Sequence, residues 1–280
     1  MSTDFLKTSN ELASLGKLFA TATVVRVEGS SSAKLGSKAI IDEEGKIVSG
    51  WIGGGCAESA VRHQALKCME SGSPQLITLD MTDEVIGVGM PCGGIMDVYL
   101  EPVFPKPEFL IVGHGRIAET LARLGTLMGF RVTVDDPGAD RQSFPSADGL
   151  ITDDLDLSAP TISSQTYVVI ATQHKSDHIS LQKALESQAA YVALVSSRHR
   201  AGLVLDYLAA TGISQEKLER VWAPAGLDLG ALTPEEIALS IMSQMVALRR
   251  GHSAHPLKHV QAADAEEKPA TVVRECSAQL

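Results

Sequence analysis

Phe109-Leu110-Ile111-Val112-Gly113-His114-Gly115-Arg116-Ile117-Ala118 is the stretch that decides the fold of this chain. Its four consecutive apolar residues predict a buried strand, and the apolar spacing over 117–128 predicts a helix directly after it. Glycines at this junction allow a tight turn and the close approach of a pyrophosphate, and the helix start offers backbone N–H groups. The stretch indicates dinucleotide binding, or else a turn that only packs strand against helix. The candidate contacts are Gly113, Gly115, Arg116 and Ala118.

Two aspartates, Asp135 and Asp136, end the next predicted strand, 131–134. Asp135 follows Gly113 by about 20 residues, where a carboxylate would accept a hydrogen bond from a ribose 2′-hydroxyl. A carboxylate there disfavours a 2′-phosphate, so an NADP-type ligand fits less well than one with a free ribose. The pair does not distinguish NAD from other dinucleotides.

Short apolar runs alternate with helical patterns through the rest of this region, which predicts a Rossmann-like, doubly wound parallel sheet. The further strands are expected near 150–152, 167–171 and 191–195. Thr172 and Gln173 leave the fourth strand on the edge where such sheets bind ligands. Arg198 follows the fifth strand in the same way and would bind an anion or form a surface ion pair. Thr233-Pro234-Glu235-Glu236 has the form of a capping box and predicts a last helix to about residue 249.

The region before this sheet reads as a smaller mixed α/β domain. Strands are expected at 22–27, 38–41, 46–51, 76–79 and 95–100, after an opening helix whose apolar face includes Phe5 and Phe19. Three prolines between 102 and 107 interrupt the pattern. We therefore expect an N-terminal domain at 1–102, a linker at 103–108, the Rossmann-like domain at 109–250 and a disordered tail at 251–280.

Two segments of the N-terminal domain set a cysteine beside glycines, Gly53-Gly54-Gly55-Cys56-Ala57-Glu58 and Cys92-Gly93-Gly94. Glycine exposes backbone N–H groups, and a cysteine beside such donors or at a helix start tends towards the thiolate. We predict that Cys56 and Cys92 lie close together and form a site. The alternative is that both are small buried hydrophobic residues in tight turns.

These segments, with Val98-Tyr99-Leu100-Glu101-Pro102 downstream, resemble the XdhC/CoxI family. The resemblance continues in Ala22–Ser31 and in Ala223–Gly230, and it covers roughly residues 20 to 250. It implies a maturation factor that binds the molybdenum cofactor, in a dinucleotide form, and delivers it to a molybdenum hydroxylase apoenzyme. Cys56 and Cys92 would then hold the metal or carry a persulfide, with Glu58 as a further catalytic candidate. A sulfur-donating desulfurase and a second copy of the chain are candidate partners.

Composition excludes several classes of protein. A formal net charge of −10 argues against nucleic-acid binding. The apolar runs are too short to span a membrane, and the N-terminus lacks the pattern of a secretory signal. The four cysteines have neither disulfide-framework nor zinc spacing, so we expect reduced thiols in the cytoplasm.

Two other functions remain open. An NAD-dependent oxidoreductase would explain the glycine loop, but no arrangement of His, Lys or Tyr reads as its proton donor. A redox-sensing protein would use a reversible disulfide between Cys56 and Cys92.

Overall fold

The structure is a computed structural model that describes residues 3–29, 31–80, 94–154, 156–172 and 177–256, and the backbone of 271–275. Cys92, Gly93 and Gln173 lie outside the described residues, as does the predicted proximity of Cys56 to Cys92. The chain divides into two compact units. The first contains residues 1–105 and 261–280, and the second contains residues 106–260.

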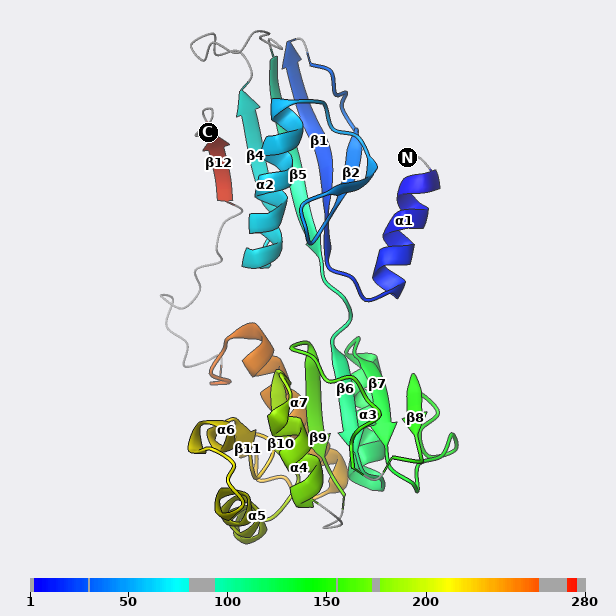
Figure 1. The fold of residues 1–280 in the computed structure, drawn as a ribbon, viewed down its shortest axis with the longest axis vertical. Helices are drawn as coiled ribbons and strands as arrows, with labels where there is room; N and C mark the ends of the chain where they lie inside the picture. The colour runs from blue at the N-terminus through cyan, green and yellow to red at the C-terminus, as the bar shows by residue number, and fades with distance from the viewer. Residues whose placement is uncertain are drawn as a thin grey trace. The chain divides into compact units, whose positions relative to one another are not determined.

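The first unit is a six-stranded sheet with the order β12-β4-β5-β1-β2-β3; Figure 1 draws β12 in red and most of the other strands of this sheet in blue to cyan. Its elements are α1 (Thr3–Ser14), β1 (Phe19–Gly29), β2 (Lys38–Asp42), β3 (Ile47–Gly50), α2 (Cys56–Ser71), β4 (Gln75–Asp80), β5 (Gly94–Val103) and β12 (Thr271–Glu275). The long strands β1 and β5 pair antiparallel along nearly their whole length and form the centre of the sheet.

Alternate residues of this sheet face different partners. Ala22, Val24 and Val98 pack with Val61 and Ala65 of α2 in one core. On the opposite face, Phe5 of α1 packs with Phe19 and Ile40 in a small separate cluster. The predicted opening helix was wrong at its end, because α1 stops at Ser14 and Phe19 already begins β1. Gly16, with φ 65°, is suited to ending a helix.

Within the segment 251–280, residues Thr271–Glu275 form β12, which pairs parallel with β4 from Thr271 opposite Gln75. The segment Thr-Val-Val-Arg-Glu is rich in β-branched residues, which favour a strand.

The second unit is a doubly wound sheet with the order β11-β10-β9-β6-β7-β8, and its strands pair in parallel throughout. Its elements are β6 (Glu108–Val112), α3 (Arg116–Leu127), β7 (Arg131–Asp135), β8 (Gly149–Ile151), β9 (Thr166–Ile170), α4 (Asp177–Glu186), β10 (Tyr191–Leu194), α5 (Arg198–Ala210), α6 (Gln215–Glu219), β11 (Val221–Trp222) and α7 (Pro234–Arg250). The predicted fold class is confirmed. The capping box at Thr233 is also present and begins α7.

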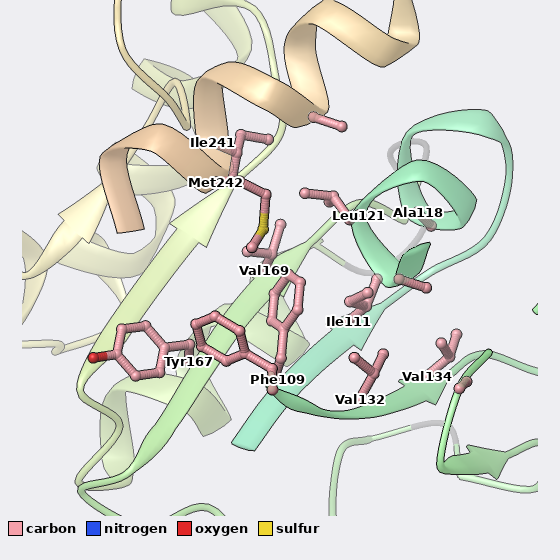
Figure 2. Packing of buried hydrophobic residues seen from close by; sticks show 14 of the residues in the cluster. Phe109, Ile111, Ala118, Leu121, Val132, Val134, Tyr167, Val169, Ile241 and Met242 are labelled. Carbon is pink, nitrogen blue, oxygen red and sulfur yellow. The ribbon is translucent and has the colours of Figure 1, made fainter. Parts of the chain in front are cut away.

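Both faces of this sheet are covered by helices, which explains the near-continuous apolar strands. Figure 2 shows one face, where Phe109, Val132 and Val169 pack against Leu121 of α3 and Met242 of α7. The intervening residues, such as Leu110, Val168 and Val192, pack on the other side against Leu181 of α4 and Leu208 of α5. This rigid sheet fixes the positions of the loops at the carboxyl ends of its strands.

In the part of the chain that the structure describes, no helix combines the length and the apolar character needed to cross a membrane.

Candidate functional site

The glycine loop joins β6 to α3, as predicted. The N–H of Gly113 donates to the carbonyl of Asp135 at 3.0 Å, which ties the loop to β7. A Cβ atom on Gly113 would lie 2.3 Å from the Ala171 carbonyl oxygen, so the glycine is required for the strands to approach. Gly115 precedes α3 with φ 95° and has no side chain with which to cap the helix. The first N–H groups of α3 are therefore not capped by the residue at this position, which suits an anion.

Asp136 and His114 connect this loop to the next one. His114 Nδ1 lies 2.8 Å from Asp136 Oδ1, and the same oxygen accepts the Gly138 N–H at 2.7 Å. The sequence prediction did not select His114, although its position between the two glycines was the available signal. The pair fixes one carboxylate and one imidazole beside the predicted pyrophosphate position.

Asp135 has a different environment from Asp136. Its side chain is buried, with 3% of its surface exposed, and its Oδ2 has no hydrogen-bond partner among the described residues. Burial, followed by the charges of Asp154 and Asp136, raises the pKa of Asp135 to about 7. Burial also acts to raise the pKa of Asp154, but N–H donors from Ala159 and Asp156 outweigh it and lower that pKa to about 2. The two predicted ribose carboxylates therefore have different chemistry: Asp136 is tied to the glycine loop, and Asp135 lies in a buried acidic cluster.

Two other predicted contacts have structural partners. Arg116 Nη2 lies 2.6 Å from Glu235 Oε1 at the start of α7, with both side chains largely exposed. Ala118 is fully buried in the core between α3 and the sheet. Arg116 remains able to reach a ligand, whereas the Ala118 side chain packs.

Thr172, just beyond β9, belongs to a buried polar network. Its hydroxyl donates to Asp177 Oδ1, and Arg200 Nη2 of α5 lies 3.2 Å from Asp177 Oδ2. Thr172 and Asp177 are 8% and 2% exposed. This network joins β9, α4 and α5 at the edge of the sheet where doubly wound folds bind ligands.

In the first unit, the triple glycine leads directly into α2. Cys56 is exposed and is the first residue of the helix, and Gly55 occupies the N-cap position, where it offers no side-chain cap. A Cβ atom on Gly54 would meet no described atom within 4 Å, so the backbone is open there. Glu58 lies in the first turn of the same helix and is half-buried. The structure thus places a solvent-accessible thiol among backbone groups that a ligand can approach.

Cys68 provides a contrast on the same helix. It is fully buried, its thiol contacts the carbonyl oxygens of Ser73 at 3.3 Å and Leu100 at 3.7 Å, and burial raises its pKa to about 11. Cys68 is thus a small buried residue of the core, whereas Cys56 is exposed to solvent.

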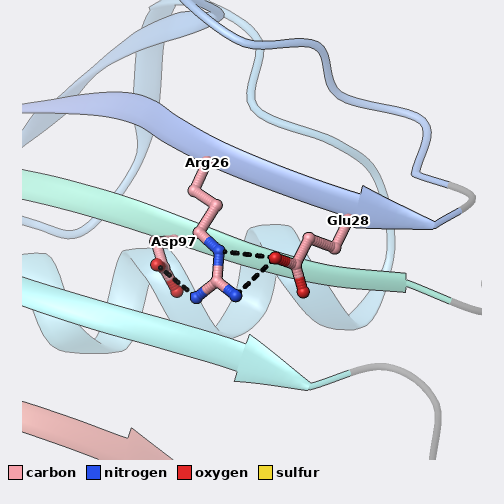
Figure 3. A network of polar contacts seen from close by, with 3 residues as sticks. All are labelled: Arg26, Glu28 and Asp97. Carbon is pink, nitrogen blue, oxygen red and sulfur yellow. Dashed lines mark hydrogen bonds and ion pairs between the residues drawn. The ribbon is translucent and has the colours of Figure 1, made fainter.

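Gly94 begins β5, opposite Gly29 at the end of β1. Figure 3 shows a charged network further along the same two strands, on the sheet face opposite α2: Arg26 contacts Glu28 Oε1 at 2.5 Å and Asp97 Oδ2 at 3.3 Å. Asp97 is 9% exposed, and none of the described residues forms a hydrogen bond with its Oδ1. Arg26 therefore neutralises a carboxylate that the sheet buries.

Comparison with known proteins covers both units. The XdhC and CoxI family model matches residues 12–80, and the XdhC Rossmann domain model matches residues 109–245. The chain belongs to the XdhC/CoxI family.

Three curated relatives agree with this assignment. The chain is 29% identical to the uncharacterized protein YqeB of Escherichia coli, across 82% of this chain and 43% of YqeB, so it spans less than half of that relative. It is 24% identical to the E. coli molybdenum cofactor insertion chaperone PaoD, across 84% of each protein. It is 25% identical to a probable xanthine dehydrogenase component of Bacillus subtilis, across 82% of this chain and 92% of that protein.

A solved structure titled as a xanthine dehydrogenase from Bacillus halodurans is 22% identical, with a TM-score of 0.48, covering 94% of this chain and 99% of the other.

The XdhC/CoxI matches include the triple glycine with Cys56 in one unit and the glycine loop, Asp135 and Thr172 in the other. Among the described residues, no group of three or more His, Cys, Asp or Glu side chains is arranged to hold a metal ion. Cys56 is exposed, and Cys68 on the same helix is buried.

Proposed function

We propose that this chain is a maturation factor that binds the molybdenum cofactor and inserts it into a molybdenum hydroxylase. The observation that carries the proposal is the likeness to the insertion chaperone PaoD over 84% of both chains, across both units. The exposed Cys56 supports it, because a cargo that is handed on must be held at an accessible position.

Each unit has a distinct part in this proposal. The open backbone at Gly54 lets the cargo approach the start of α2, where the Cys56 thiol is exposed. A thiolate is a ligand suited to molybdenum, and as a persulfide it would carry sulfur that a desulfurase partner supplies. The glycine loop of the second unit binds the pyrophosphate of a dinucleotide form of the cofactor, with Asp136 and His114 beside it. Reduced thiols suit a cytoplasmic protein.

The direct test is co-expression with a molybdenum hydroxylase, comparing wild type, Cys56→Ala and Gly54→Ala. We expect both variants to lower hydroxylase activity and the molybdenum that copurifies with the chain. Their folding should be unchanged, because Cys56 is exposed and the added Cβ at residue 54 has open space. Ser59→Ala, an exposed change in the first turn of α2, is the matched control. Unchanged activity and unchanged molybdenum content in both variants would refute the role of this segment.

A second candidate function is an NAD-dependent oxidoreductase, which the glycine loop favours. Titration with NAD and with cytidine nucleotides, followed by hydride-transfer assays, distinguishes the two functions. Gly115→Val should weaken nucleotide binding, because the side chain enters the space of the pyrophosphate. It also strains the backbone, which has φ 95° there, so the unfolding temperature of the variant is measured beside its affinity. Binding of cytidine nucleotides without hydride transfer supports the maturation factor; hydride transfer supports the oxidoreductase.

A further inference from the structure

The start of α5 places positive charges where a helix least favours them. Arg198, His199 and Arg200 fill its first turn, and that turn contains no acidic residue. The helix N-terminus is itself the positive end of the macrodipole, so cations there are unfavourable unless an anion is present. A local arrangement that opposes stability is typical of a functional site.

Two buried polar atoms beside this turn lack partners within the described part of the chain. Ser196 follows β10, and its buried hydroxyl oxygen forms no hydrogen bond to a described residue. The buried Nε of Arg200 also forms none with the described residues. Buried polar groups are nearly always hydrogen-bonded, so two such atoms in one place require an explanation. The Arg200 Nε–H can only donate, and the serine hydroxyl can donate, so the missing partner is an acceptor.

The surrounding contacts prepare these groups for a ligand. Ser197 caps α5 by accepting the Arg200 N–H at 3.3 Å, and Asp177 holds the other end of the Arg200 guanidinium at 3.2 Å. Arg198 is 88% exposed and lies 3.9 Å from Asp228, which is equally exposed, so its charge is available. Ser196 is only half-buried as a residue, and a change of rotamer that exposes its hydroxyl breaks no hydrogen bond to a described residue.

We propose that Ser196, Arg198 and Arg200 at the start of α5 form a binding site for an oxyanion, a phosphate or an oxo group of similar shape. The site lies at the same sheet edge as the glycine loop, because β10 is separated from β6 only by β9. Two strand spacings place it roughly 10 Å from that loop, within reach of a second group of one extended ligand. Only the identity of the molecule that carries the oxyanion rests on the proposed function.

The test uses the full chain and inorganic phosphate at constant ionic strength, in a Trp51→Phe background that serves as wild type, with thermal unfolding followed by the fluorescence of Trp222. Phosphate should raise the unfolding temperature of wild type. Ser196→Ala and Arg198→Gln should each weaken the apparent phosphate affinity about tenfold, which is typical of one hydrogen bond to a charged group. Ser196→Ala removes an unpartnered hydroxyl, so without phosphate its unfolding temperature should equal or exceed that of wild type. A purely structural serine would not combine these two results.

A further variant locates the effect. Arg123→Gln removes an exposed arginine from the later part of α3 and should keep the phosphate response of wild type. Equal phosphate affinity in wild type, Ser196→Ala and Arg198→Gln would overturn the proposal, as would an equal loss of the response in Arg123→Gln.

Nucleotide titration identifies the source of the oxyanion. If the nucleotide carries it, Ser196→Ala should also weaken cytidine diphosphate binding; if it is a free anion, only phosphate or molybdate binding should change. Failure of the maturation function would appear instead in the hydroxylase assay, with the phosphate response intact.

Discussion

Asp135→Asn tests the buried acidic cluster at the end of β7. Asp135 is 3% exposed and has a pKa of about 7, so the folded protein keeps its proton between pH 4 and 7, where the unfolded chain has lost it. A raised pKa of an acid means that stability is highest at low pH and is lost as the pH rises through the folded pKa. Asparagine has nearly the same shape and does not ionise, so the variant should escape this loss.

The size of the change in the free energy of unfolding follows from the pKa shift of Asp135. A shift from 3.8 to about 7 corresponds to an upper bound of about 4 kcal/mol, at 1.36 kcal/mol for each pKa unit. Relaxation of the site and entry of water reduce such values, and we expect about 1–2 kcal/mol. The free energy of unfolding of Asp135→Asn should thus gain about 1–2 kcal/mol over wild type between pH 5 and pH 8.

The assay is urea unfolding at four pH values in a Trp51→Phe background, which leaves Trp222 as the sole tryptophan and a reporter on the second unit. Asp206→Asn, an exposed change on α5, controls for the loss of one negative charge. The reasoning is wrong if the difference in the free energy of unfolding between Asp135→Asn and its parent stays constant over this pH range. It is also wrong if Asp206→Asn shows the same pH-dependent difference.

Other predictions follow from single contacts. Gly226→Ala should unfold the second unit at markedly lower urea concentration, because residue 226 has φ 101°, which strains a side chain, and its Cβ would lie 3.1 Å from the Ile241 backbone nitrogen. Tyr191→Phe should cost about 1 kcal/mol in urea unfolding, because Tyr191 donates to buried Gln244 at 2.6 Å. Peptide mass mapping after brief alkylation at pH 8 should find Cys56 modified and Cys68 intact, since Cys56 is exposed and Cys68 is buried; labelling of Cys68 in the folded protein would contradict the packing of α2.

The doubly wound sheet could be predicted from the sequence because its strands are apolar on both faces and lie between helical segments. The run Phe109–Val112 is apolar without a break, and the structure divides it alternately between the α3 and α4 sides. The N-terminal helix was harder to predict. Phe19 has the spacing of the helix face that contains Phe5, and it does pack with Phe5, but from β1. A shared core position does not reveal which element supplies the side chain.

The roles of neighbouring polar residues could not be read from the chain. Asp135 and Asp136 are chemically identical and adjacent, but successive side chains near a strand end point in opposite directions. One is buried beside Asp154 and the other meets His114. The partners come from a loop after β8 and from the turn after β6, so only the assembled sheet separates a buried acid from a candidate ligand contact. The same holds for Ser196, whose lack of a partner among the described residues is a property of the fold.

The glycines show where structure adds most to the functional argument. A glycine can be present because another backbone approaches, because the chain needs a positive φ, or because a ligand needs the space. Gly113 has the first reason, and Gly55, with φ 63°, has the second. Gly54 has neither: its φ is not in the left-handed region, and a Cβ there would contact no described atom. Folding therefore does not require a glycine at this position, and the open space beside Cys56 fits the proposed approach of a ligand.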